Sequence, residues 1–139
     1  MKKLNESVTI ITGASSGIGA ATALKLAKAG SNIVLVSRAD DKIEKVKKQI
    51  VAEGGKAEIF VADVTDIDQM KAMADFAIKK FGRIDNLVNN AGLMLFSQWK
   101  DVAIEEWNAM IDTNIKGYLN AIAAVLPKLL EQKSGHILN

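Results

Sequence analysis

Hydrophobic and polar residues follow two alternating patterns along this chain of 139 residues. Short runs of β-branched and aliphatic residues predict buried strands, and stretches with apolar residues three and four apart predict helices that bury one face. The expected strands cover residues 7–12, 32–37, 57–62, 86–89 and 136–138, and the expected helices cover 17–29, 40–53, 67–81, 104–112 and 114–131. Strand and helix therefore alternate along the chain.

The ends of these helices carry recognisable signals. Gly30, Gly54 and Gly82 follow expected helices, and glycine favours the left-handed turn that ends a helix. Asp66 is expected to cap the helix that follows it. The residues expected to face inward are Ala20, Ala21, Leu24 and Ala27 in 17–29, Ile43, Val46 and Ile50 in 40–53, and Ile67, Met70, Ala74, Ile78 and Phe81 in 67–81.

The last expected helix, 114–131, is apolar on most of its surface. Its apolar residues are Ile115, Leu119, Ile122, Val125, Leu126, Leu129 and Leu130. A helix of this composition is expected to be largely buried. Pro127 removes one helical hydrogen bond and predicts a bend near Ala123.

The alternation of strands and helices predicts an α/β fold, a doubly wound parallel sheet with helices on both faces and right-handed crossovers. With five strands, the expected order is 3-2-1-4-5. Such sheets bind ligands at the carboxyl edge, where the strand order changes direction. We therefore expect a crevice between the first and fourth strands, flanked by residues 13–19 and 89–92. Residues 1–139 are expected to form one domain.

Residues 8–19, VTIITGASSGIG, place a strand, a glycine-rich turn and a helix start in succession. Such a turn presents backbone N–H groups and a helix N-terminus to a phosphate. We assign Gly13 to the tight turn, Gly17 to close approach of a ligand and Gly19 to packing of the helix on the strand. Ser15, Ser16 and Ile18 complete the expected binding turn. The spacing differs from G-x-G-x-x-G, so an ordinary βα turn is the alternative.

Composition excludes several kinds of chemistry. The net charge is +2, and 49% of the residues are hydrophobic and 24% charged, as in a globular protein. Lys42, Lys45, Lys47 and Lys48 lie opposite an apolar helical stripe, which indicates a solvated helix face and not a nucleic-acid-binding surface. The chain has no cysteine and hence no disulfide or zinc–thiolate chemistry, which fits a cytoplasmic location, and we expect no metal site. The apolar runs are too short to predict a membrane span.

The residues after the second expected strand bear on the choice of cofactor. An NAD site places Asp or Glu about 20 residues after the glycines, where the carboxylate binds the ribose 2′-OH. This chain has Ser37 and Arg38 there. The arginine fork makes charge-assisted hydrogen bonds to a 2′-phosphate, so NADP(H) is favoured over NAD(H). The alternative is a solvent-facing Arg38 that pairs with Asp40 or Asp41, a surface bridge worth about 0–1 kcal/mol.

Two further turns follow the third and fourth expected strands. Asp63 and Val64 close the third strand, and a carboxylate there can accept a hydrogen bond from an adenine amino group. Capping of a turn is an equally open role for Asp63. After the fourth strand, small residues and amides allow a ribose or nicotinamide to lie against the backbone, although a plain βα turn is the alternative. The cofactor-binding residues expected there are Asn90, Ala91 and Gly92.

These motifs together resemble those of the short-chain dehydrogenase/reductase family. The matching residues are Thr12–Gly19, Asp63–Val64, Asn89–Gly92 and Asn114 within Asp112–Gly117, and they follow the family's order along the whole chain. The resemblance implies a Rossmann fold and hydride transfer between a nicotinamide and a carbonyl or hydroxyl carbon of a small molecule. It also implies a catalytic role for Asn114, which in the family holds a water in a proton relay.

The sequence departs from the family in the rest of the catalytic tetrad, which is Ser, Tyr and Lys. Tyr118 is the sole tyrosine, and Ile122 stands four residues later, where the family has Lys. The family's Ser lies just past Asn139, where this sequence stops. We therefore expect the cofactor-binding N-terminal half of such an enzyme, truncated before the sixth and seventh strands. It is expected to be inactive alone, because general acid–base catalysis contributes about 10²–10⁴ in rate.

Two other functions stay open. One is a non-catalytic NADP(H)-binding module or assembly subunit that another chain completes, and the other is a fold that has lost nucleotide binding. In either case the edge of the fifth strand and the apolar side of the helix 114–131 are expected to be exposed. We expect a homo-oligomer that forms through one of these surfaces.

Overall fold

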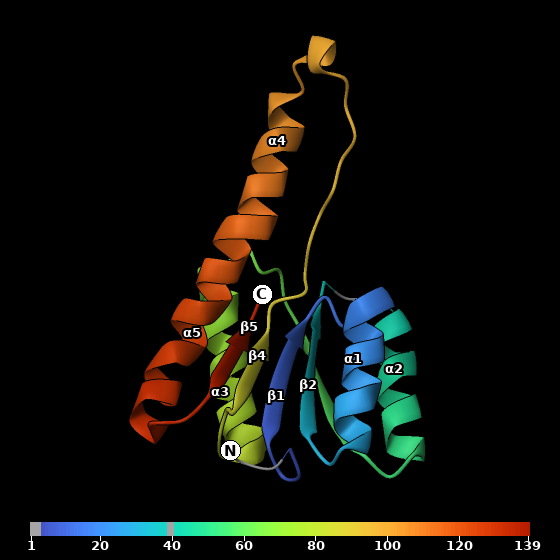
Figure 1. The fold of residues 1–139 in the computed structure, drawn as a ribbon, viewed down its shortest axis with the longest axis vertical. Helices are drawn as coiled ribbons and strands as arrows, with labels where there is room; N and C mark the ends of the chain where they lie inside the picture. Colours follow the sequence, from blue (N-terminus) through green and yellow to red (C-terminus); the bar gives the residue numbers. More distant parts are fainter. Residues whose placement is uncertain (1–3, 39–40) are drawn as a thin grey trace.

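A central parallel sheet organises the computed structural model, which describes residues 4–38 and 41–139. Its strands are β1 (Val8–Thr12), β2 (Asn32–Ser37), β3 (Lys56–Val61), β4 (Asn86–Val88) and β5 (His136–Leu138). They are hydrogen-bonded in the order β3-β2-β1-β4-β5, and every pair is parallel (Figure 1). The predicted strand order is therefore confirmed.

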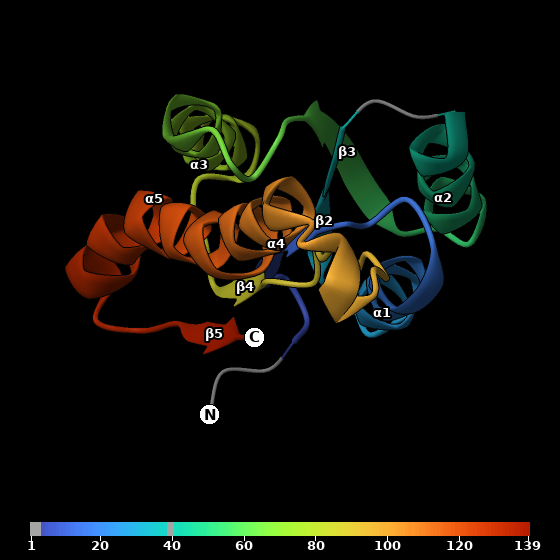
Figure 2. The ribbon, with the colours of Figure 1, turned by 90° about the horizontal axis from the view of Figure 1, so that it is seen from above.

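Helices cover both faces of this sheet. They are α1 (Gly17–Lys28), α2 (Asp41–Ala52), α3 (Ile67–Phe81), α4 (Ile104–Ile111) and α5 (Gly117–Gln132), with a short 3₁₀ turn at Trp99–Asp101 and a π-helical turn, η2, at Asp112–Lys116. The pair α1 and α2 lies on one face, and α3 and α5 lie on the other (Figure 2). The doubly wound α/β arrangement predicted from the sequence is thus present.

The core has two parts because successive strand residues point to opposite faces of a sheet. Ile10 and Val34 belong to the cluster beneath α3 and α5, together with Met70 and Val125. Their chain neighbours belong to the cluster beneath α1 and α2, which contains Ile11, Ile33, Leu35, Ala23, Ile43 and Ile50. These strands are buried on both faces, as their continuous apolar runs indicate.

The predicted inner side of helix α1 is correct in three of its four residues, since Ala27 is buried and Ala20 and Leu24 pack half-buried against the core. Gly19, Ala23 and Ala27 are its buried residues, whereas Ala21, expected to face inward, is exposed. Gly19, Ala23 and Ala27 are four residues apart and form the side of α1 that faces the sheet. Because alanines occur on several sides of this helix, the sequence did not fully show which side is buried. The expectation for α2 is confirmed, since Ile43, Val46 and Ile50 are buried.

Helix α3 begins as predicted, at a carboxylate cap. The Oδ1 atom of Asp66 accepts hydrogen bonds from the backbone N–H groups of Asp68 and Gln69 at 2.9 and 3.1 Å. The Gln69 bond foremost lowers the pKa of Asp66 below its ordinary value. The helix buries Met70, Met73, Ala74 and Ala77, while Ile67, Ile78 and Phe81 are only half-buried.

The two helices expected near the end of the chain form one continuous helical run. Helix α4 passes through η2 directly into α5 (Figure 1). Asn114 therefore lies inside η2. The prediction that a helix begins at Asn114 is wrong. Within η2 the N–H of Gly117 bonds to the carbonyl of Asp112, a five-residue spacing. Pro127 lies inside α5, and the bend near Ala123 stays a prediction.

The expectation that this last helix is largely buried is wrong. Only Gly117, Ala121, Val125 and Leu129 are buried in α5, all on the side that faces the sheet and α3. Four large apolar side chains on η2 and α5 are exposed, namely Ile115 at 55%, Leu119 at 58%, Leu126 at 39% and Leu130 at 67%. The helix packs on one side only, so its apolar outer side faces solvent. The separate expectation that the apolar side of the helix 114–131 is exposed is therefore confirmed.

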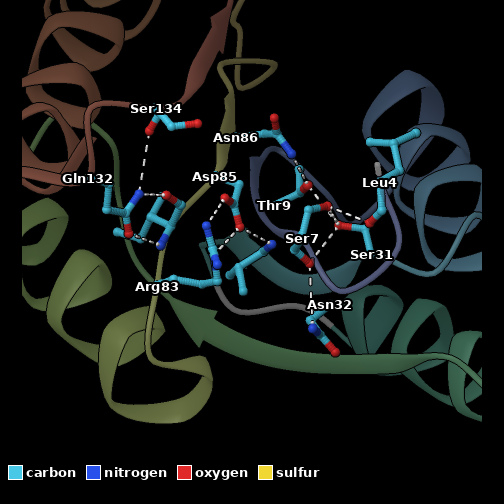
Figure 3. Close-up of polar contacts among 12 residues, drawn as sticks. Leu4, Ser7, Thr9, Ser31, Asn32, Arg83, Asp85, Asn86, Gln132 and Ser134 are labelled. Atoms are coloured by element: carbon cyan, nitrogen blue, oxygen red, sulfur yellow. Dashed lines mark hydrogen bonds and ion pairs between the residues drawn. The ribbon is translucent and has the colours of Figure 1, made fainter. Parts of the chain in front are cut away.

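A buried polar network closes the amino edge of the sheet, opposite the carboxyl ends of the strands. The Thr9, Ser7 and Ser31 hydroxyls are joined at 2.9 Å, and the Asn86 amide donates to Thr9 Oγ1 at 2.9 Å (Figure 3). Nearby, the Gln132 amide donates to the Ile84 carbonyl at 2.6 Å and so attaches the end of α5 to the start of β4. Each of these hydroxyls and amides therefore has a hydrogen-bond partner within the protein.

Within residues 4–38 and 41–139, no helix combines the length and the apolar character that crossing a membrane requires.

Candidate functional site

A crevice of about 660 Å³ opens at the carboxyl edge of the sheet, between the loops that follow β1 and β4. This is where the strand order changes direction, so the predicted location is correct. Its walls come from four strand ends and from η2. The lining residues are Gly13, Ser15, Ser16, Val36, Ser37, Arg38, Ala62, Asp63, Val64, Asn90, Ala91, Gly92, Leu93 and Thr113.

Most of the predicted binding residues share this crevice. Gly13, Ser15, Ser16, Ser37, Arg38, Asp63, Val64, Asn90, Ala91 and Gly92 all line it. Four predicted residues do not, namely Gly17, Ile18, Gly19 and Asn114. Ile18 stands in the first turn of α1 with 79% of its surface exposed, which is unusual for a large apolar residue. It is thus free to contact a ligand at the mouth of the glycine turn.

The glycine turn has the backbone that its sequence predicts. Gly13 has φ +66° and Gly17 has φ +54°, and L-residues with side chains adopt this left-handed region rarely. A Cβ at Gly13 would lie 2.8 Å from the Cα of Ala91, so the turn abuts the β4 loop. Nothing lies within 4 Å of a Cβ built at Gly17, which leaves that side open for approach.

Gly19 packs closely, but against a different partner from the one expected. A Cβ there would overlap the carbonyl oxygen of Gly13 and lie 2.5 Å from Nδ2 of Asn90. The absence of a side chain at Gly19 therefore lets α1 approach the turn and the Asn90 amide, and the strand itself is not the contact. The prediction of a packing role holds with this correction.

Asn90 joins the two loops that form the crevice. Its Nδ2 donates to the carbonyls of Thr12 and Gly13, both at 3.1 Å. In return, Thr12 Oγ1 accepts hydrogen bonds from the backbone N–H groups of Asn90 at 3.0 Å and Ala91 at 3.1 Å. Both Nδ2 and the backbone N–H of Asn90 are thus committed to the β1 end, so this residue joins the two loops with its donors.

An unpartnered polar atom lies at the end of β2. Ser37 Oγ is buried in the crevice wall and has no hydrogen-bond partner within the described part of the chain. Such orphaned hydroxyls are uncommon in folded proteins, because each one forgoes a bond that water would have made. A ligand oxygen in the crevice would satisfy it.

Arg38 follows Ser37 and is exposed at the crevice. Among the described residues it makes no ion pair, so the predicted alternative of a bridge to Asp41 is wrong. The other expected partner, Asp40, lies outside the described residues. The arginine fork and the Ser37 hydroxyl together form a donor pair suited to a phosphate oxygen.

Asp63 fulfils the turn-capping role left open by the sequence. Its Oδ1 accepts hydrogen bonds from the N–H of Thr65 at 2.9 Å and from the Thr65 hydroxyl at 2.8 Å. Its own N–H donates to Gln69 Oε1 at 2.8 Å. The carboxylate is thereby fixed in the crevice wall beside Val64. This arrangement leaves the adenine contact a prediction.

The family follows from the sequence as a whole. A family model described as short chain dehydrogenase matches residues 7–139. The chain belongs to the short-chain dehydrogenase family.

Similar proteins are bacterial oxidoreductases. An uncharacterized oxidoreductase of Listeria monocytogenes is 47% identical over 135 residues, which are 97% of this chain and 54% of the relative. Another, from Staphylococcus epidermidis, is 45% identical over 139 residues, which are 100% of this chain and 59% of the relative. The chain thus spans a little over half the length of these curated relatives.

Solved structures agree with this fold. A metagenomic short-chain oxidoreductase in complex with NADP superposes with a TM-score of 0.91 at 39% identity, covering 98% of this chain and 62% of that one. An NAD⁺-bound xylitol dehydrogenase superposes with a TM-score of 0.93 at 33% identity, covering 98% of this chain and 53% of that one. One protein bound to NADP and one bound to NAD⁺ therefore share the fold of this short-chain dehydrogenase chain.

Asn114, the residue expected to be catalytic, is engaged with the backbone of this short-chain dehydrogenase chain. Its Oδ1 accepts from the Leu93 N–H at 2.7 Å, and its Nδ2 donates to the Leu93 carbonyl at 2.8 Å. The side chain thus holds the β4 loop against η2, beside Thr113, which lines the crevice. The catalytic role implied by the family resemblance stays a prediction.

Four lining residues were missed from the sequence. Val36 and Ala62 immediately precede predicted residues, and their places at strand ends were a usable signal. Leu93 and Thr113 reach the crevice only because η2 turns towards the β4 loop, which no local pattern indicates. Across residues 4–38 and 41–139, no three His, Asp or Glu side chains gather into a potential metal site.

Proposed function

We propose that this chain forms the NADP(H)-binding part of an oxidoreductase that transfers a hydride between the nicotinamide and a carbonyl or hydroxyl carbon. The observation that carries the choice of cofactor is the pair at the end of β2. Ser37 presents a buried, unpartnered hydroxyl there, and the exposed guanidinium of Arg38 follows it. Both groups can bind a 2′-phosphate. Neither of these two positions holds the Asp or Glu of an NAD site, whose carboxylate would repel that phosphate.

The proposed binding mode uses the chain's own groups in three places. The first turn of α1 and the backbone of Gly13–Gly17 would hold the pyrophosphate, because a helix N-terminus and free N–H groups attract anions. Ser37 and Arg38 would hold the 2′-phosphate, and Asp63 would accept from the adenine amino group. The residues Asn90–Gly92 would present backbone to the nicotinamide side, where the bound cofactor supplies hydride chemistry.

We also propose that these 139 residues do not catalyse turnover by themselves. The sequence holds one tyrosine, Tyr118, and the residue four positions later is Ile122 in place of a lysine. Tyr118 is half-buried in α5, with its backbone carbonyl accepting from Asn89 Nδ2 at 3.5 Å. This chain therefore has no tyrosine with a lysine four residues later to act as the general acid. General acid–base catalysis contributes a factor of about 10²–10⁴ to the rate.

A second candidate function is a non-catalytic NADP(H)-binding module in a larger assembly, with the cytoplasm as its proposed location. The apolar outer side of α5 and the edge strand β5 favour it, since Leu130 and Leu138 are 67% and 52% exposed. A hydride-transfer assay with NADPH and a panel of ketones tests the claim, common to both proposals, that this chain does not turn over substrate alone. Turnover by this chain would contradict the claim of inactivity, and binding without turnover would agree with it.

Cofactor choice is tested by titrating NADPH and NADH into the wild type and the Arg38→Ala variant while following nicotinamide fluorescence. Loss of charge-assisted hydrogen bonds is expected to weaken NADPH binding by about tenfold or more and NADH binding far less. The matched control is Lys79→Ala, which removes the same charge from the last turn of α3, outside the crevice. Equal weakening of both cofactors by Arg38→Ala would remove the 2′-phosphate assignment.

A further inference from the structure

The helical run formed by η2 and α5 binds two loops beside the crevice through asparagine side chains. Asn114, in η2, holds Leu93 of the β4 loop by two hydrogen bonds. Six residues later, Asn120 of α5 donates from Nδ2 to the carbonyl of Val64 at 3.0 Å and to that of Thr65 at 3.2 Å. The turn between β3 and α3 is therefore attached to α5 by its backbone.

The side chain of Val64 also attaches this turn to α5, because it packs against Gly117. Val64 is 6% exposed, and a Cβ built at Gly117 would lie 2.6 Å from Val64 Cγ2. The absence of a side chain at Gly117 thus lets α5 close on Val64, while Asn120 binds the carbonyl groups beside it. Contacts of both kinds fix the distance between α5 and this turn.

This fixed turn determines where the Asp63 carboxylate lies. Asp63 Oδ1 accepts from the N–H and the hydroxyl of Thr65, the residue whose carbonyl binds Asn120. A shift of Thr65 therefore moves both donors that orient Asp63 in the crevice wall. Asn120 does not itself line the crevice, so any effect it has on a ligand passes through this turn.

We propose that Asn120 is a positioning residue that places Asp63 for recognition of the adenine base, a role that rests on the proposed NADP(H) function. A carboxylate oxygen accepts a hydrogen bond from the 6-amino group of adenine. Hypoxanthine carries a carbonyl oxygen at that position, which the carboxylate repels. A correctly placed Asp63 therefore favours adenine over hypoxanthine, and a displaced one loses this preference.

The test compares three ligands, NADPH, its hypoxanthine analogue and NADH, titrated by nicotinamide fluorescence into the wild type and Asn120→Leu. The wild type is expected to prefer adenine by about tenfold, since a charge-assisted hydrogen bond has that order of effect. Asn120→Leu is expected to reduce this preference to about twofold or less. The ratio between NADPH and NADH should stay unchanged, because Asn120 binds the carbonyls of Val64 and Thr65, whereas Ser37 is held by the pairing of β2 with β3.

Two further variants make the comparison specific. Asp63→Asn should remove the same base preference, because it removes the repelling carboxylate directly. Asn108→Leu makes the same substitution at an exposed asparagine of α4, outside the crevice, and should leave all three affinities as they are. If Asn120→Leu does not fold, as judged by thermal denaturation, Asn120→Ser removes the same donor with a smaller change of surface.

The outcomes separate this role from general destabilisation. An adenine preference that persists in both Asn120 variants overturns the inference, as does equal weakening of all three ligands. A wild type that binds NADPH without base preference also overturns it but leaves the proposed cofactor standing. A wild type that binds no NADPH overturns the proposed function and this inference together.

Discussion

Asp85 is 5% exposed at the amino edge of the sheet, and its carboxylate binds both a strand and an arginine. Its Oδ2 accepts from the Val8 N–H at 2.9 Å and from Arg83 Nε at 2.7 Å, and its Oδ1 accepts from Arg83 Nη2 at 2.6 Å (Figure 3). Removing this buried carboxylate leaves the Arg83 guanidinium, which is 33% exposed, without its partner. Here it would also leave a β1 backbone donor unsatisfied.

We therefore predict that Asp85→Ala lowers the free energy of unfolding by about 1.5–3 kcal/mol, the range for the loss of hydrogen bonds to a charged group. Asp85→Asn should lose less, because its amide oxygen can still accept from Val8. Urea unfolding monitored by circular dichroism measures both. The matched control is Asp68→Ala, whose carboxylate is 87% exposed and pairs with Lys71, and it should lose about 0–1 kcal/mol. Similar losses for Asp85→Ala and Asp68→Ala would contradict the prediction.

At this scale, the sequence predicts residues whose role is local. Gly13 and Gly17 were found because left-handed turns select glycine, and Ser37, Arg38 and Asp63 because parallel strands end at one edge. The hydrogen bonds from Asn120 to the β3–α3 turn could not be predicted, since the two carbonyl groups that accept them lie 55 and 56 residues earlier in the chain. Only the packed position of α5 brings these groups together.

Among the elements, the edge strand β3 is linked to a helix on each face of the sheet through one carboxylate. Glu58 on β3 pairs with Lys47 of α2 at 2.9 Å and with Lys80 of α3 at 3.6 Å. The hydrogen bond from Lys47 is the main cause that lowers the pKa of Glu58 below 4.5, although partial burial opposes it. Inward or paired charges of this kind also protect an edge strand from pairing with other chains.

The lowered pKa gives a prediction about acid stability. A carboxyl group whose pKa is lower in the folded state stabilises the protein above its unfolded value and loses that contribution as pH falls through its folded value. Glu58 should therefore contribute above about pH 4.5 and progressively less below it. Glu58→Gln is expected to be less stable than the wild type at neutral pH, with the difference narrowing in acid.

Urea unfolding at neutral pH and at several values below pH 4.5 measures this difference. Glu53→Gln serves as the control, since Glu53 is exposed just after α2 and hydrogen-bonds only to Gln49 among the described residues. A stability difference between wild type and Glu58→Gln that stays constant across this range would refute the role assigned to the pKa.

Element types and most boundaries follow from the sequence, whereas the junction of α4 and α5 does not. Local periodicity indicates helix on both sides of Thr113, and the predicted helices divide there. In the structure, the π turn η2 joins them, because it inserts an extra residue without ending the helix. That turn sets Asn114 against Leu93, so a candidate site residue depends on a feature without a local signature.

For the molecule as a whole, alternating strands and helices were sufficient to predict the order β3-β2-β1-β4-β5, because right-handed crossovers leave few other arrangements. The amount of exposed apolar surface was harder to predict. The apolar character of α5 suggests burial on every side, yet only the side against the sheet and α3 is covered. A sequence pattern shows that a surface is apolar but does not show what covers it.

The uncovered side of α5 leads to the last prediction. Ile115, Leu119, Leu126 and Leu130 are between 39% and 67% exposed, and β5 beside the helix is an open edge. Contiguous apolar surface of this kind drives association, and two copies commonly pair through the same patch. We therefore predict that the chain self-associates through this side of α5, as its apolar pattern already suggests.

Sedimentation velocity over a range of concentrations measures this association. The double variant Leu119→Lys with Leu130→Lys places charges on the apolar side without touching the buried residues of α5, so it should shift the chain towards monomer. The control is Val51→Lys, which puts one such charge at a 53% exposed apolar site on α2, on the opposite face of the sheet (Figure 2). If the control disperses the oligomer as well as the double variant does, association depends on net charge and not on this surface. If the wild type is monomeric throughout, the apolar side of α5 is not a self-association site, and the exposed edge of β5 does not act as one either.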